Sequence, residues 1–198
     1  LGWSPERVHA EQTRRLQILL AIAKERSPFH AARLAHVEPD RFELDDLGRL
    51  PVMTKSEMMA DYDDVVTDRR LTRARVEAHL ARLGEDVELL ENEFVALSSG
   101  GSSGVRGIFT YRSDEAIHIV AAVLRRGIAQ MSAEIGWPPP GPLRLAMVAA
   151  PVSVHATRVL PAFADGAIAE VNHVPVTLPF PAIVDRVQCI QPTLLTGY

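Results

Sequence analysis

The residues best suited to chemistry form a short stretch rich in glycine and serine, between Ser98 and Gly107. Its ten positions contain four glycines, four serines, Val105 and Arg106. Glycine lets backbone amides approach a ligand and permits positive φ, and serine hydroxyls donate hydrogen bonds to phosphate oxygens. Successive amides in such a turn form a concave anion site, to which Arg106 adds a charge-assisted contact. We therefore interpret the stretch as a phosphate-binding loop.

A flexible linker is the alternative interpretation of this composition. The flanking sequence argues against it, because apolar runs typical of strands lie on both sides, Phe94–Leu97 and Ile108–Tyr111. The Walker pattern requires Gly-Lys-Ser/Thr at the end of the loop, and the dinucleotide pattern requires Gly-x-Gly-x-x-Gly. Neither pattern is present, which disfavours a P-loop NTPase and a Rossmann dinucleotide site.

The segments around and after the loop predict alternating strands and helices. A further strand is expected at Val87–Leu90, and Ser113 is expected to cap a helix that runs to about Glu134. The later elements are predicted as a strand at Leu143–Ala150, a helix at Val154–Phe163, a strand at Ala167–Val171, a helix at Pro181–Ile190 and a buried strand at Thr193–Thr196. Such alternation indicates an α/β fold with a mostly parallel sheet covered by helices, which places the loop at a sheet edge.

The preceding residues are expected to be mainly helical. Ser4-Pro5-Glu6 is typical of a helix start, and Ser27-Pro28 ends that helix near Arg26. Thr54 and Glu57 form the two ends of a capping box, and another helix is predicted at Leu71–Leu83. The expected organisation is a helical lead-in at residues 1–84 and an α/β portion at 85–198 that contains the loop.

Composition narrows the classes of partner. Of the 198 residues, 47% are hydrophobic and 23% are charged, and the net charge is −4. Without a basic stripe or an apolar run of membrane-spanning length, no nucleic acid and no membrane are expected as partners. The single cysteine, Cys189, favours a cytosolic setting and is expected to be buried. The scattered histidines show no His-x-x-x-His pair, so no metal-ligating residues are predicted.

Several motifs together resemble the adenylate-forming (AMP-binding) enzymes. Ser99-Gly100-Gly101-Ser102-Ser103-Gly104 resembles the ATP phosphate loop of that superfamily. Three further elements resemble its phenylacetate–coenzyme A ligase branch, and they occur in the expected order: Glu25-Arg26-Ser27-Pro28-Phe29-His30, Leu50-Pro51-Val52-Met53-Thr54-Lys55-Ser56-Glu57 and Pro192-Thr193-Leu194-Leu195-Thr196-Gly197-Tyr198.

The resemblance implies a two-step ligase reaction. A carboxylic acid, aryl or acyl, attacks the α-phosphate of ATP to give an acyl-adenylate, and the thiol of coenzyme A then displaces AMP. The implied ATP-phosphate contacts are Ser99, Gly100, Gly101, Ser102, Ser103 and Gly104, with Arg106 beside them and Mg²⁺ sharing the phosphate charge. His155 follows a predicted strand and corresponds to a residue that lines the acyl pocket, although it also fits a solvent-facing helix start.

Departures from the family pattern leave two other functions open. Arg106-Gly107 stands where the family loop commonly has Pro-Lys, and the chain ends before the family's later elements and its small C-terminal domain with the catalytic lysine. The chain is therefore expected to be an N-terminal fragment that is inactive alone and that is poorly soluble or self-associates, with a homodimer as one outcome. The alternatives are a catalytically silent scaffold on the same fold and an adenylating enzyme that loads a carrier-protein thiol.

Overall fold

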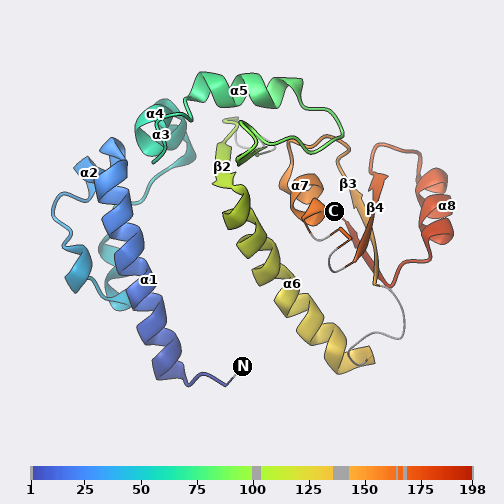
Figure 1. The fold of residues 1–198 in the computed structure, drawn as a ribbon, viewed down its shortest axis with the longest axis horizontal. Coiled ribbons are helices and arrows are strands. Elements are labelled where there is room, and N and C mark those ends of the chain that lie inside the picture. Colours follow the sequence, from blue (N-terminus) through green and yellow to red (C-terminus); the bar gives the residue numbers. More distant parts are fainter. Residues whose placement is uncertain (1, 100–103, 136–142, 164, 167–168, 198) are drawn as a thin grey trace. The chain divides into compact units, whose positions relative to one another are not determined.

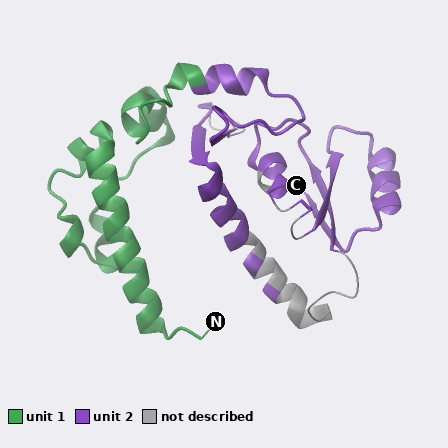
Figure 2. Ribbon diagram, in the orientation of Figure 1, with its two compact units in different colours: residues 1–75 green, residues 76–198 purple. Residues whose placement is uncertain are grey.

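The computed structural model describes residues 2–99, 104–135, 143–163, 165–166 and 169–197. The chain forms two compact units, Leu1–Arg75 and Val76–Tyr198 (Figure 2). The boundary between them lies within helix α5, Arg73–Arg82. The change from a helical to an α/β segment was expected after the same helix, at residue 84.

The regular secondary structure described in the first unit is entirely helical. These are α1 (Pro5–Arg26), α2 (Pro28–Arg33), the 3₁₀ helices η1 (Pro39–Arg41) and η2 (Leu44–Arg49), α3 (Lys55–Ala60) and α4 (Tyr62–Val65). The predicted start signals are confirmed: the Ser4 hydroxyl accepts from the amide of Arg7, and Thr54 and Glu57 form the capping box of α3. The side-chain oxygens of these residues accept from backbone amides that would otherwise lack a partner at a helix start.

A small apolar core holds the first unit together. Leu20 of α1 packs with Leu34, Val37 and Phe42, which follow α2. Two polar side chains of α1 reach the same segment, because Lys24 Nζ donates to the carbonyl of Val37 (2.6 Å) and Gln17 Nε2 donates to that of Phe42 (3.1 Å). The long first helix therefore organises the irregular chain that follows it.

The second unit contains two separate β structures. Strands β1 (Phe94–Ser98) and β2 (Ile108–Arg112) form an antiparallel pair, whereas β3 (Arg144–Ala149), β4 (Glu170–Pro175) and β5 (Leu194–Gly197) form a parallel sheet in the order β4-β3-β5. The helices are α6 (Ser113–Ile135), α7 (Ala156–Ala162) and α8 (Phe180–Ile190). The fold is mixed α/β with a small parallel sheet, as predicted, but the strands that flank the loop are antiparallel and form a sheet of their own.

The strand order explains the positions of α7 and α8. The chain passes from β3 through α7 to β4 on one side of β3, and then returns through α8 to β5 on its other side. Right-handed crossovers in opposite directions place the two helices on opposite faces of the sheet, and Figure 1 shows them so. The β1–β2 hairpin packs on α6 and α7 through Val95, Leu97, Ala116 and Val159.

Two expectations about strands are corrected. Val87–Leu90 is not a strand, because the chain reverses through Glu91 and Asn92 at positive φ and only Leu90 forms a bridge, to Phe94. The strand predicted at Ala167–Val171 is β4 instead, which runs to Pro175; Ala167 and Ile168 lie outside the described residues. The prediction ended before His173 and Pro175 because proline disfavours a strand. Strand β4 includes Pro175 because it lies at the edge of the sheet, where proline is tolerated.

Two predictions of burial are also wrong. Cys189 of α8 is exposed, as is the preceding Gln188. The predicted last strand is β5, but it is an edge strand, and Leu194 and Leu195 are 40% and 55% exposed. Apolar sequence alone did not distinguish a central strand from an edge strand, since that depends on which segments pair.

We predict that Gly197→Ala destabilises the parallel sheet. A methyl group on Gly197 would lie 2.9 Å from the carbonyl oxygen and 3.1 Å from Cβ of Val148 on β3, so β5 would have to move away. The free energy of unfolding, measured by urea titration, is expected to fall by about 1–3 kcal/mol. Gly84→Ala is the control in the same unit, since no atom lies within 4 Å of the added group. Equal midpoints for the two variants would contradict the close approach of β5 to β3.

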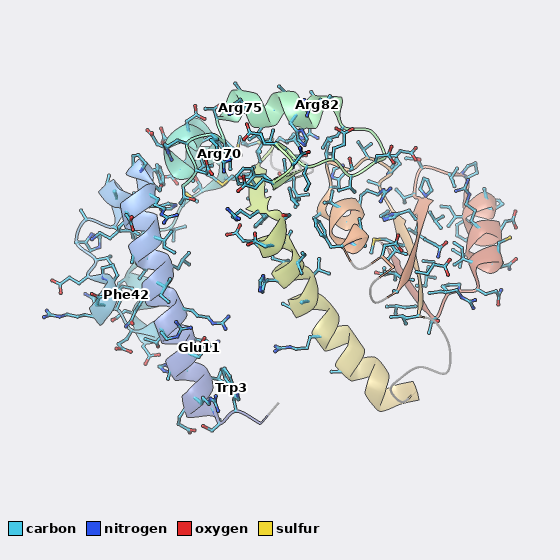
Figure 3. The ribbon with its side chains drawn as sticks, in the orientation of Figure 1. Trp3, Glu11, Phe42, Arg70, Arg75 and Arg82 are labelled. Atoms are coloured by element: carbon cyan, nitrogen blue, oxygen red, sulfur yellow. The ribbon has the colours of Figure 1, made fainter. Side chains whose placement is uncertain are left out.

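We also predict a loss of stability in weak acid that involves His79 of α5. Its side chain is 1% exposed, and Arg82 (labelled in Figure 3) donates to its Nδ1 at 3.0 Å. Burial, together with the charge of Arg82, lowers the pKa of His79 against the opposing effect of Glu88. The unfolded ring, with a pKa of about 6.5, therefore binds a proton where the folded ring does not. The contribution to stability is complete above about pH 6.5 and is lost as the pH falls below it.

The measurement is a series of urea titrations between pH 5 and pH 8. One histidine contributes a slope of at most about 1.4 kcal/mol per pH unit. His79→Gln is expected to reduce the slope of the free energy of unfolding against pH. Burial lowers the pKa of His30 and His173 as well, so part of the slope should remain in His79→Gln. An unchanged slope in His79→Gln would refute the assignment.

Candidate functional site

The glycine- and serine-rich loop connects the two strands of the β1–β2 hairpin. Ser98 and Ile108 are the last residues in register, and the next pair closes the base of the loop. There the amide of Ser99 donates to the carbonyl of Gly107 (2.9 Å), and the amide of Gly107 donates to the Ser99 hydroxyl oxygen (2.8 Å). Ser99 still has its own hydroxyl proton to donate. Two hydrogen bonds therefore fix where the loop begins and ends.

A third hydrogen bond fixes the base of the loop to the parallel sheet. The amide of Ser98 donates to the carbonyl of Val154 (2.8 Å), in the connection that leaves the carboxyl end of β3 for α7. Open α/β sheets bind ligands outside the carboxyl ends of their strands, where connections diverge to opposite faces. Although the hairpin is not a strand neighbour of this sheet, its loop begins at the edge where such a fold binds ligands.

The predicted contacts are described only in part. Gly100, Gly101, Ser102 and Ser103 lie outside the described residues. Gly104 has φ +82°, a conformation that side chains rarely adopt, and nothing lies within 4 Å of the position of its missing Cβ. Arg106 is exposed and Gly107 is buried. The described part of the loop thus offers a residue that requires glycine for its backbone conformation, and a cation open to solvent.

His155 lies close in sequence to the point where the loop meets the sheet. It directly follows Val154, whose carbonyl accepts the amide of Ser98. The carbonyl of His155 accepts from the amides of Arg158 and Val159 at 2.9 and 3.1 Å, so this residue starts α7, and it is half-buried. The structure therefore places His155 one residue from the bond that fixes the loop. Its role in an acyl pocket stays a prediction.

Two features of the site were missed by sequence reasoning. The hydroxyl of Ser98 is buried, in a residue that is 6% exposed, and has no hydrogen-bond partner among the described residues. Ser153 is 1% exposed, and both its amide and its hydroxyl donate to the carbonyl of Gly84, at 2.9 and 3.0 Å. The only signal in the sequence was a serine just after a predicted buried strand, which does not identify a partner 69 residues away.

Two of the three other sequence elements that resemble the ligase branch lie within the first unit, and the third contains β5 of the second unit. The Ser27 hydroxyl donates to the carbonyl of Asp64 (2.8 Å). Arg33, just after the first of these elements, donates to the carbonyl of Val52 and lies 3.6 Å from Glu57, which are both in the second. These contacts give the two elements a structural role in holding α2 against the segment that leads into α3.

A hollow of about 220 Å³ in the first unit is a weaker candidate for a ligand site. Its lining residues include Phe42 (labelled in Figure 3), Arg41 and Arg49. Each guanidinium already has a carboxylate partner, Glu38 at 3.1 Å for Arg41 and Asp46 at 3.0 Å for Arg49. Because these charges are paired locally, the hollow offers little net attraction to an anion.

The comparisons with known proteins leave the resemblance as an expectation. No protein-family model and no curated protein sequence matches the chain. Among the described residues, no cluster of histidine, cysteine, aspartate or glutamate could hold a metal ion. No helix in the described ranges combines the length and the apolar composition that crossing a membrane requires.

We predict opposite effects on stability for two neighbouring serines. Ser98→Ala removes a buried hydroxyl that has no partner in the described part of the chain, so the free energy of unfolding should stay constant or rise by up to about 1 kcal/mol. Ser99→Ala removes the acceptor of a buried amide, so it should lower that free energy by about 1 kcal/mol. Urea titrations of the two variants, which differ by one position, provide the comparison. A loss in Ser98→Ala as large as that in Ser99→Ala would show that the Ser98 hydroxyl has a partner.

Proposed function

We propose that the β1–β2 loop binds the phosphates of ATP, and that the protein activates a carboxylic acid as an acyl-adenylate for transfer to coenzyme A. One observation carries the proposal: a loop of glycine and serine is closed at its base by Ser99 and Gly107 and is bonded through Ser98 to the carboxyl edge of a parallel sheet. A flexible linker is not expected to be hydrogen-bonded at both of its ends and to the edge of a sheet.

The donors of this loop fit a phosphate group. Ser98 has a buried hydroxyl without a hydrogen-bond partner among the residues that the structure describes, Gly104 has a positive φ, and Arg106 is an exposed cation. With the hydroxyls of Ser102 and Ser103, and the backbone amides between them, they would orient the β- and γ-phosphates while the carboxylate attacks the α-phosphate. Mg²⁺, when bound with ATP, would neutralise part of the phosphate charge. The single cysteine fits a cytosolic setting for this reaction.

A catalytically silent scaffold is the second candidate, and the end of the loop favours it. Gly107 occupies a position where the resembling enzymes commonly carry lysine, and its amide and carbonyl are both bonded to Ser99. The position therefore closes the loop and supplies no charge to a phosphate. Arg106 is one residue earlier, and a guanidinium is not equivalent to the compact ammonium of lysine.

The test is acid-dependent exchange of pyrophosphate into ATP, assayed on the full-length protein with a panel of aryl and acyl acids. Exchange with at least one acid is expected. The double variant Ser102→Ala/Ser103→Ala should reduce it by about a hundredfold or more, because donors to a developing charge act in the transition state. Ser56→Ala, exposed on α3, is the control and should keep the wild-type rate.

A folded protein that exchanges no pyrophosphate with any acid, and that also fails to bind ATP, would reject the ligase proposal. The silent scaffold would then be the better account. Exchange that survives the double serine substitution would retain adenylation but would remove the phosphates from this loop.

A further inference from the structure

Ser153 makes an unusual pair of contacts for a residue in a short connection. It is 1% exposed, and its amide (2.9 Å) and hydroxyl (3.0 Å) both donate to one acceptor, the carbonyl of Gly84. Two donors on one carbonyl use both of its lone pairs, so the direction of approach is restricted as well as the distance. The contact joins the segment after α5 to the segment after β3.

The next two residues transmit this constraint to the loop. Val154 is 7% exposed, and its carbonyl accepts the amide of Ser98, the last residue of β1. His155 then starts α7 through its own carbonyl. Three consecutive residues therefore bond to three different segments, and Val154 is held between two neighbours whose positions are already fixed.

We propose that Ser153 is a positioning residue for the phosphate loop. By holding the β3–α7 connection on the carbonyl of Gly84, it sets where the carbonyl of Val154 meets the amide of Ser98, and so where the loop begins at the edge of the sheet. Ser153 acts through Val154 and Ser98 and does not contact the nucleotide. The proposal deepens the proposed function and rests on it for its consequence in ATP binding.

Removal of the hydroxyl should loosen one place only. In Ser153→Ala the hydrogen bond from the backbone amide of residue 153 to the carbonyl of Gly84 remains. The hydrogen bond from the hydroxyl, which restricts the direction of approach, is lost. The amides at the base of the loop, those of Ser98, Ser99 and Gly107, should then open more often. We expect their hydrogen exchange to accelerate about tenfold, which corresponds to the loss of about one hydrogen bond's stabilisation.

The same variant should weaken the use of ATP. A loop base displaced by a fraction of an ångström presents its donors less well to the phosphates. For pyrophosphate exchange in the full-length protein, we expect the KM for MgATP to rise about tenfold, while the KM for the acid stays within about twofold. If Ser153 served only folding, the folded fraction of the variant would keep the wild-type KM for MgATP and for the acid.

Thr157→Val provides a matched control. Thr157 lies in α7 four positions after Ser153, and its hydroxyl is buried and has no hydrogen-bond partner among the described residues. The substitution thus removes a buried hydroxyl from the same region without removing a bond. Neither the exchange of the Ser98 amide nor the KM for MgATP should change. If Ser153→Ala does not fold, Ser153→Cys keeps a group of similar shape with a much weaker donor.

The outcomes separate this proposal from the proposed function. The proposal is supported if amide hydrogen exchange accelerates only at Ser98, Ser99 and Gly107 and the KM rises for MgATP but not for the acid. Uniform acceleration across residues 76–198 would reduce Ser153 to a stabilising residue and overturn the proposal, as would unchanged exchange at these three amides. If the wild type exchanges no pyrophosphate, the adenylation reaction is rejected, while the amide measurement still decides whether Ser153 fixes the base of the loop.

Discussion

The hydrogen bond from the amide of Ser98 to the carbonyl of Val154 connects two β structures that share no strand pairing. On one side of it is an antiparallel hairpin with the glycine- and serine-rich loop, and on the other is the carboxyl edge of a parallel sheet, where open α/β folds bind ligands. Apolar contacts of Val95 and Leu97 with Ala116 and Val159 press the hairpin onto α6 and α7. Such contacts tolerate sliding, whereas a hydrogen bond of 2.8 Å specifies one register.

Glycine has a different physical role at each of three positions in the second unit. Gly104 adopts a positive φ within the loop, which side chains rarely do. Gly107 is buried at the base of the loop and is bonded there to Ser99. Gly197 allows β5 to approach Val148 more closely than any other residue could. The three glycines thus act through backbone conformation, loop closure and strand packing respectively. The glycine content of the sequence does not distinguish these roles.

The helices could be predicted because their signals are contacts between residues near in sequence. Strand pairing and burial depend on contacts between distant segments, so they could be predicted only in part. Ser4 and Thr54 could be recognised as caps because their partners lie three residues away in sequence. The strands that flank the loop were found from their apolar runs, but their antiparallel pairing and separate sheet were not. Burial failed at Cys189 and Leu195 because exposure there depends on which segments cover them. The loop was identified by composition, whereas its attachment through Ser98, Ser153 and Gly84 joins distant segments and leaves no local pattern.

The end of the loop sets a physical condition on any activity. With Gly107 bonded to Ser99, the side-chain cation nearest the end of the loop is Arg106, which is exposed to water. A unit charge pair at 4 Å contributes only about 1 kcal/mol in bulk water and several times more where water is excluded. An exposed guanidinium therefore cannot replace a lysine that closes on phosphate unless the rest of the protein covers it. The proposed phosphate binding would therefore depend mainly on amides and hydroxyls at and beyond the base of the loop.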